Sequence, residues 1–99
     1  MNMQNLMAQA QKMQRDIQNK KNELDKMEFV GKSEWVEIIF DGSKNLKNIK
    51  ITKEFPIDED DKEILEDMIS IAINDAYAKI NEETTKKLGQ YANALNGFM

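Results

Sequence analysis

The apolar positions between Ile64 and Ile80 follow a helical spacing on two adjacent faces. One row repeats every fourth residue from Ile64 to Ala76, a second row runs beside it from Leu65 to Ile80, and in the middle only Ser70 is polar. A helix with one wet face has one apolar stripe, whereas a helix that is apolar nearly all round is covered on two sides. We therefore predict that the chain's own sheet covers one side and a second copy of the chain the other. The residues assigned to this dimer interface are Met68, Ile69, Ile71, Ala72, Ile73 and Ala76.

The first 28 residues predict one long helix. Met1–Met27 is rich in Gln, Lys, Met and Ala, which are good helix formers, and contains no Gly or Pro. Alternating steps of three and four form an unbroken heptad seam from Met3 to Met27, in which Lys20 is the only polar residue. Such a helix is roughly 36 Å long, whereas strands of six to eight residues reach about 20–27 Å. We therefore expect residues 1–28 to extend beyond the sheet as an arm.

Residues 29–53 predict a small antiparallel sheet of two or three strands. Glu28–Ser33 is a short extended piece that is expected to turn at Gly31, and Trp35–Phe40 alternates between two faces. Asp41-Gly42-Ser43 is a hairpin signal. The alternation then assigns Lys47, Ile49 and Ile51 to one face of Leu46–Thr52 and Leu46, Asn48 and Lys50 to the other. The apolar face of this sheet is expected to pack on the helix Ile64–Ile80.

Residues 58–88 predict the core helix and its extension. Asp58 is a plausible N-cap, and the carboxylates after it suit the positive end of the helix dipole. This helix start accounts for the acidic cluster without a ligand, so it is preferred over a hard-cation site. Lys86 and Lys87 suit the C-terminal end, Gly89 is a stop signal, and residues 89–99 form a tail with no assigned structure.

Composition narrows the possible functions. The 99 residues correspond to one domain and include no cysteine and no histidine, which removes thiolate chemistry, the commonest general base and the commonest metal ligand. Carboxylate pairs such as Glu66/Asp67 lie on a helix exterior with no group to complete a site. We therefore expect no catalysis, cofactor, metal or small-molecule substrate. The chain shows neither a signal peptide nor a membrane helix, which predicts a cytoplasmic protein without membrane contact.

The charge is unevenly distributed along the chain. Residues 1–53 contain ten Lys/Arg and seven Asp/Glu, hence +3, and residues 54–99 contain four and eleven, hence −7, which together give the net charge of −4. Such asymmetry can direct one end of a molecule toward a polyanion. An ordinary charged surface is the simpler explanation of the asymmetry, so charge alone does not indicate DNA binding.

The order of these segments resembles the YbaB/EbfC family of bacterial nucleoid-associated DNA-binding proteins. The resemblance rests on MAQAQKMQRDI (residues 7–17), MEFVGKSEWVEIIFDG (27–42), LKNIKI (46–51) and DEDDKEILEDMISIAINDAYAK (58–79), and it covers about residues 1–88. It implies an α+β fold in the order α-β-β-β-α and a tweezers-like homodimer with projecting arm helices. It also implies a nucleoid location, binding to duplex DNA with little sequence specificity, and a role in nucleoid organisation and gene regulation. The chain departs from the family at Lys32-Ser33-Glu34, where members often carry glycines.

The candidate DNA contacts are cations on the two predicted helices, because phosphate contacts dominate DNA affinity. They are Lys12, Arg15, Lys20, Lys21, Lys26, Lys79, Lys86 and Lys87. Base stacking by Trp35 is less favoured than a place in the core or an interface. An alternative function stays open, in which the heptad helix docks a partner helix as a coiled-coil-type interaction module without DNA binding.

Overall fold

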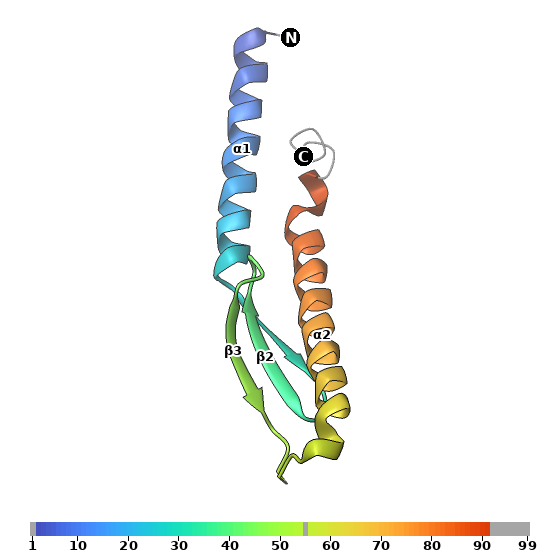
Figure 1. Cartoon of the computed structure of the whole chain (residues 1–99). Coiled ribbons are helices and arrows are strands. Elements are labelled where there is room, and N and C mark those ends of the chain that lie inside the picture. The colour runs from blue at the N-terminus through green and yellow to red at the C-terminus, as the bar shows by residue number, and fades with distance from the viewer. Residues whose placement is uncertain (1, 55, 92–99) are drawn as a thin grey trace.

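Two long helices and a three-stranded antiparallel sheet make up the computed structural model of the chain, which describes residues 2–54 and 56–91 (Figure 1). The elements are α1 (Met3–Lys26), β1 (Glu28–Lys32), β2 (Val36–Asp41), β3 (Leu46–Ile51), a 3-10 turn at Glu59–Asp61, α2 (Lys62–Leu88) and a 3-10 turn at Gly89–Tyr91. The predicted α-β-β-β-α order is therefore confirmed. The predicted tail lies outside the described residues beyond Tyr91.

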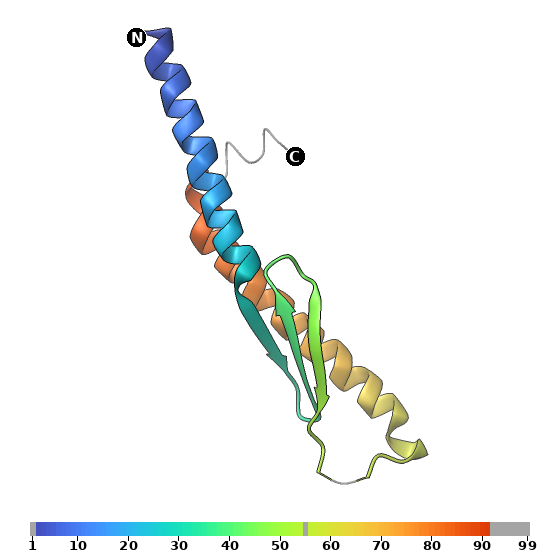
Figure 2. The same cartoon turned by 90° about the vertical axis from the view of Figure 1, so that its left-hand side faces the viewer.

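The molecule is elongated, with principal extents of 70 × 19 × 16 Å. Helix α2 runs along one face of the sheet, and its C-terminal part lies beside the C-terminal part of α1 (Figures 1 and 2). The N-terminal part of α1 extends past both, so Met3, Leu6, Met7 and Met13 are exposed. In α1, Asn2 caps the first turn by accepting a hydrogen bond from the backbone N–H of Gln4, at 3.0 Å.

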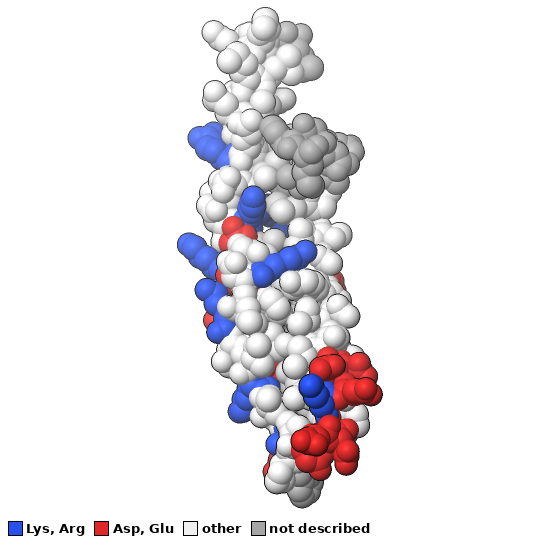
Figure 3. Space-filling view, viewed as in Figure 1, with Lys and Arg blue, Asp and Glu red and all other residues white. Residues whose placement is uncertain are grey.

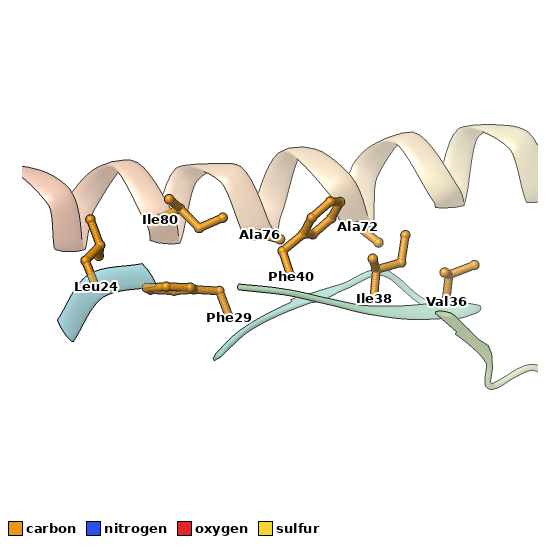
Figure 4. Close-up of a cluster of buried hydrophobic side chains, with 8 residues drawn as sticks. All are labelled: Leu24, Phe29, Val36, Ile38, Phe40, Ala72, Ala76 and Ile80. Carbon is orange, nitrogen blue, oxygen red and sulfur yellow. The ribbon is translucent and has the colours of Figure 1, made fainter. Parts of the chain in front are cut away.

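The core lies between α2 and strands β1 and β2. Ile38 and Val36 of β2 are fully buried, as the alternation predicted. The cluster consists of Leu24, Phe29, Val36, Ile38, Phe40, Ala72, Ala76 and Ile80 (Figure 4). Strand β3 pairs with β2, but every one of its residues is exposed, so α2 covers only two of the three strands.

An irregularity in the pairing of β2 with β3 changes the predicted faces of β3. Ile38 lies opposite Ile49, but beyond Ile39 the register shifts so that Phe40 lies opposite Leu46. Paired residues lie on the same side of a sheet, so Leu46 shares the helix-facing side with Ile49. The prediction that placed Leu46 on the other face is therefore wrong, because simple alternation does not detect a bulge.

Gly31 lies inside β1 and does not form the expected turn. A Cβ atom at this position would be 1.9 Å from the backbone oxygen of Ala72 and 2.8 Å from the Cβ of Ala76. The strand and the helix therefore approach each other more closely than any side chain would allow. Ala72 and Ala76 are fully buried against the sheet of their own chain, which corrects their assignment to the dimer interface, because they have no surface left for a partner.

Asp58 is an N-cap as predicted, but it caps the 3-10 turn Glu59–Asp61, and the α-helix α2 begins only at Lys62. The carboxylate of Asp58 accepts the backbone N–H of Asp60 at 2.9 Å, and the carboxylate of Asp61 accepts the backbone N–H of Asp58 at 3.2 Å, which forms a capping box. Lys53 Nζ lies 2.8 Å from the same Asp61 carboxylate. Backbone groups and a lysine thus occupy oxygens of the acidic cluster. At the other end, Gly89 ends the α-helix with right-handed torsions and continues into the 3-10 turn.

Candidate nucleic-acid interface

Acidic side chains are most concentrated at the start of α2, although Asp16, Glu23 and Asp25 also lie among the cations of α1. Figure 3 shows Lys and Arg spread along the side formed by α1 and the sheet, with Asp and Glu gathered where α2 begins. The acidic end consists of Asp58, Glu59, Asp60, Asp61, Glu63, Glu66 and Asp67. The charge asymmetry along the sequence is therefore an asymmetry in space, because the arm and the start of α2 lie at opposite ends of the molecule.

The five predicted cations of α1 form no ion pair within the described part of the chain. They are Lys12, Arg15, Lys20, Lys21 and Lys26. Lys20 is half-buried, as its seam position indicated, and the others are exposed. At 3.6 residues per turn, Lys12, Arg15 and Lys26 share one side of the helix, and Lys21 lies on another side. The cations of α1 therefore do not all lie on one side of the helix.

Two of the three predicted cations of α2 are held by carboxylates. Lys79 Nζ lies 3.2 Å from the Asp75 carboxylate and donates a hydrogen bond to the carbonyl oxygen of Val30. Lys87 Nζ lies 3.4 Å from Glu23 of α1 and 3.9 Å from Glu83. Lys86 is exposed and forms no ion pair with the residues that the structure describes.

Asp75 links α2 to the edge of the sheet. Its carboxylate accepts the backbone N–H of Lys32 at 3.0 Å. This hydrogen bond and the contact with Lys79 lower the pKa of Asp75 below its ordinary value. Because Lys79 and Asp75 together hold β1 against α2, the geometry supports a structural role for Lys79.

The β2–β3 hairpin carries two lysines that are not among the predicted DNA contacts, Lys44 in the turn and Lys47 in β3. Asp41 is 8% exposed, and its carboxylate accepts the backbone N–H groups of Ser43 and Asn45, each at 2.9 Å. The bond from Asn45 is the main reason why the pKa of Asp41 is lowered. Lys47 Nζ lies 3.6 Å from this carboxylate, whereas Lys44 Nζ lies over the ring of Tyr77, 5.2 Å from its centroid. Two lysines close to an Asp-Gly turn were the available signal.

An open apolar face lies beside this hairpin. Leu46, Ile49 and Ile51 of β3 are 50–52% exposed on the helix-facing side of the sheet. The neighbouring row of α2 consists of Ile69, Ile73 and Tyr77, which are half-buried. Tyr77 contacts Phe40 edge to face, with ring centroids 5.1 Å apart, so this row faces the β3 side. We call these six residues the open apolar face.

The described residues contain neither a membrane-spanning helix nor a group of side chains placed to bind a metal. None of their helices has the length and apolar character needed to cross a membrane. Among these residues, no group of three acidic, histidine or cysteine side chains is placed to hold a metal ion.

The family model of the YbaB/EbfC DNA-binding family matches residues 1–95. The chain belongs to this family. A nucleoid-associated protein of Streptococcus uberis is 47% identical over 97 residues, which cover 96% of this chain and 97% of the relative. A nucleoid-associated protein of Streptococcus pyogenes serotype M5 is 46% identical over the same shares of the two chains. The resemblance inferred from the sequence is thereby confirmed.

In this YbaB/EbfC chain, the predicted contact residues do not form one continuous site. The α1 cations form no ion pair with other described residues, whereas Lys79 and Lys87 are paired with carboxylates. Lys44 of the hairpin and Lys21 of α1 line the same hollow. Of the remaining predicted dimer residues, Ile69 and Ile73 belong to the open apolar face and Met68 packs against the core. Ile71 is 51% exposed and shares a helical row with Asp75 and Lys79, on the β1 side.

Proposed function

We propose that this YbaB/EbfC chain binds duplex DNA in the nucleoid through the phosphate backbone, with little sequence preference, as a homodimer. The single observation that carries the proposal is the set of α1 cations, which form no ion pair with other described residues, on a helix that extends past the body of the molecule (α2 and the sheet) (Figure 1). A cation held by a carboxylate gains less from a phosphate, because the existing pair must first be broken. The family and its nucleoid-associated relatives support DNA as the polyanion.

Backbone contact is a better account than base reading. Three strands lie between α1 and α2 along the sequence, so the described residues contain no helix-turn-helix pair to place in a major groove. Phosphate contacts position a protein on DNA without reading its sequence. The acidic end of α2 would repel the duplex, which orients the DNA toward α1 and away from that end.

The open apolar face supports the homodimer. Leu46, Ile49 and Ile51 are half exposed although they line the same side of the sheet as the core. Exposed apolar surface of this kind, bordered by polar residues, marks an interaction site. A second copy placed on the open apolar face would cover all six of its residues and would set two basic arms in one particle.

The proposal is tested by fluorescence anisotropy with a mixed-sequence duplex at several salt concentrations. We expect the logarithm of the association constant to fall against the logarithm of salt with a slope of about −4 to −6, for five or six neutralised phosphates. Replacing Lys12, Arg15 and Lys26 together by Ala should flatten the slope by about 0.9 for each phosphate contact that is lost.

A matched control removes three cations away from the arm, Lys32, Lys50 and Lys62, which are exposed and unpaired among the described residues. This variant should retain the wild-type slope. An equal effect of both triple variants would show that only total charge matters and would contradict a site on α1. Light scattering on the same samples measures the mass, and a monomer at the binding concentration would contradict the homodimer.

The second candidate function is a coiled-coil-type interaction module. It is favoured by the exposed seam residues at the free end of α1, which are Met3, Leu6 and Met13. A dimer that does not bind the duplex even at low salt would select this alternative and reject DNA binding.

A further inference from the structure

A hollow of ≈ 720 Å³ lies where α1, the β2–β3 turn and α2 meet. Leu24, Ile80 and Leu88 contribute its apolar lining. Lys21 of α1 and Lys44 of the turn line it from two different elements. The hollow therefore combines apolar surface with two cations from different elements, and such cations attract a phosphate group.

The turn that carries Lys44 is rigidly placed. A Cβ atom on Gly42 would lie 1.9 Å from the backbone oxygen of Leu24, so the turn packs directly on the last turns of α1. Asp41 holds the turn from inside through the backbone N–H groups of Ser43 and Asn45. Lys44 completes it with a left-handed backbone, at a φ of 67°. The spacing between α1 and the turn is therefore set by backbone contacts.

The ammonium group of Lys44 is oriented without being neutralised. It lies over the ring of Tyr77, 5.2 Å from the centroid, and an aromatic ring attracts a cation without removing its charge. Lys47, three residues later, is instead paired with the Asp41 carboxylate. Lys21 has no ion pair in the described part of the chain. The hollow thus has two free cations and one carboxylate, Asp25, at its lining.

We propose that this hollow binds one phosphate group of duplex DNA through Lys21 and Lys44. The inference rests on the proposed DNA binding and extends it, because the duplex would be held by the hairpin of the body as well as by α1. Lys21 is the cation that lies apart from Lys12, Arg15 and Lys26 on α1. On that side of the helix, Lys44 of the hairpin lines the same hollow and supplies a second cation for one phosphate.

The test compares single variants in salt titrations with a mixed-sequence duplex. Lys44→Asn removes the charge and keeps the turn, since Asn tolerates a left-handed backbone and Ala does not. Lys21→Ala removes the other cation. We expect each variant to flatten the slope by about 0.9 for each phosphate contact that is lost. Lys44→Arg should retain the wild-type slope, and Lys50→Ala, an exposed lysine of β3 outside the hollow, should leave it unchanged.

Asp25 provides a test of opposite sign. It lines the same hollow and lies in the last turn of α1. A carboxylate there is repelled by the negative end of the helix dipole. Asp25→Asn should therefore strengthen DNA binding without a loss of thermal stability, and the gain should disappear when Lys44→Asn is also present.

The outcomes separate this inference from the proposed function. A wild-type chain that does not bind the duplex would overturn both. Wild-type binding with a normal slope, unchanged in Lys21→Ala and Lys44→Asn, would overturn only the hollow. A rise in Tm with inorganic phosphate that requires Lys21 and Lys44, together with an unchanged DNA slope, would assign the hollow to free phosphate and overturn the DNA contact.

Discussion

Helices α1 and α2 are similar in length, with 24 and 27 residues, but they differ in what they bury. Leu24 is the one buried residue of α1, whereas α2 buries Ala72, Ala76, Ile80 and Leu88. The small side chains of α2 let it approach β1 closely, and the long side chains of α1 mostly remain in solvent. Helix α2 therefore holds the fold together, and α1 can change its surface with little effect on stability.

The cations of the two helices follow the same division. Lys79 and Lys87 of α2 pair with carboxylates that tie elements together, and the α1 lysines and Arg15 do not pair in the described residues. A charge that supports the fold and a charge that is free to meet a ligand look alike in the sequence. Whether a lysine is paired with a carboxylate therefore indicates its role better than its solvent exposure does.

Truncating an apolar side chain should give the largest difference in stability between the body and α1. Ile38→Ala removes a fully buried side chain of β2 and should lower the free energy of unfolding by about 2–5 kcal/mol, because it leaves a cavity. Met7→Ala changes a side chain that is 60% exposed on α1 and should cost at most about 0.5 kcal/mol. Urea denaturation measures both. A similar cost for both variants would show that the free end of α1 is packed in solution.

The contact of α2 with β1 gives the next largest effect. Gly31→Ala forces a Cβ atom into the backbone of Ala72 and should destabilise the chain by about 1–3 kcal/mol, as overpacking does. Gly89→Ala is the matched control, because its Cβ would be 3.8 Å from Thr85 and its backbone is already helical. A neutral Gly31→Ala variant in thermal denaturation would contradict the close approach of strand and helix.

Acid should weaken the body more than α1, with a smaller effect. The pKa values of Asp41 and Asp75 are lowered in the folded chain, mainly by backbone hydrogen bonds from Asn45 and Lys32. Their stabilisation is therefore present above the ordinary value of 3.8 and is lost as the pH falls through the lower folded value. The Asp41→Asn/Asp75→Asn double variant should lose less Tm between pH 5 and pH 3 than the wild type.

The control for this measurement is Asp16→Asn on α1, whose carboxylate accepts none of the described hydrogen bonds. Its Tm should depend on acid as that of the wild type does. If the Tm of the Asp41/Asp75 variant falls between pH 5 and pH 3 as much as that of the wild type, these two carboxylates do not cause the acid dependence of stability.

Much of the fold was predictable because its signals are local. The heptad seam, the alternation of Val36, Ile38 and Phe40, and the cap at Asp58 each depend on residues close in the sequence. The candidate site was predictable only in part. The α1 cations were found from their helix, but Lys44 was missed, because its place beside Lys21 depends on how the turn packs against α1.

The sequence by itself determined the order of the elements, their caps and the family, because short-range periodicity and backbone preferences specify them. The tertiary structure alone decided that Ala72 and Ala76 face Gly31, that Leu46 turns toward the helix side, and that Lys79 and Lys87 are paired. These outcomes depend on the register between strands and on distances between elements far apart in the chain. No local pattern contains that information, because a contact across 40 residues is set by packing of the whole core.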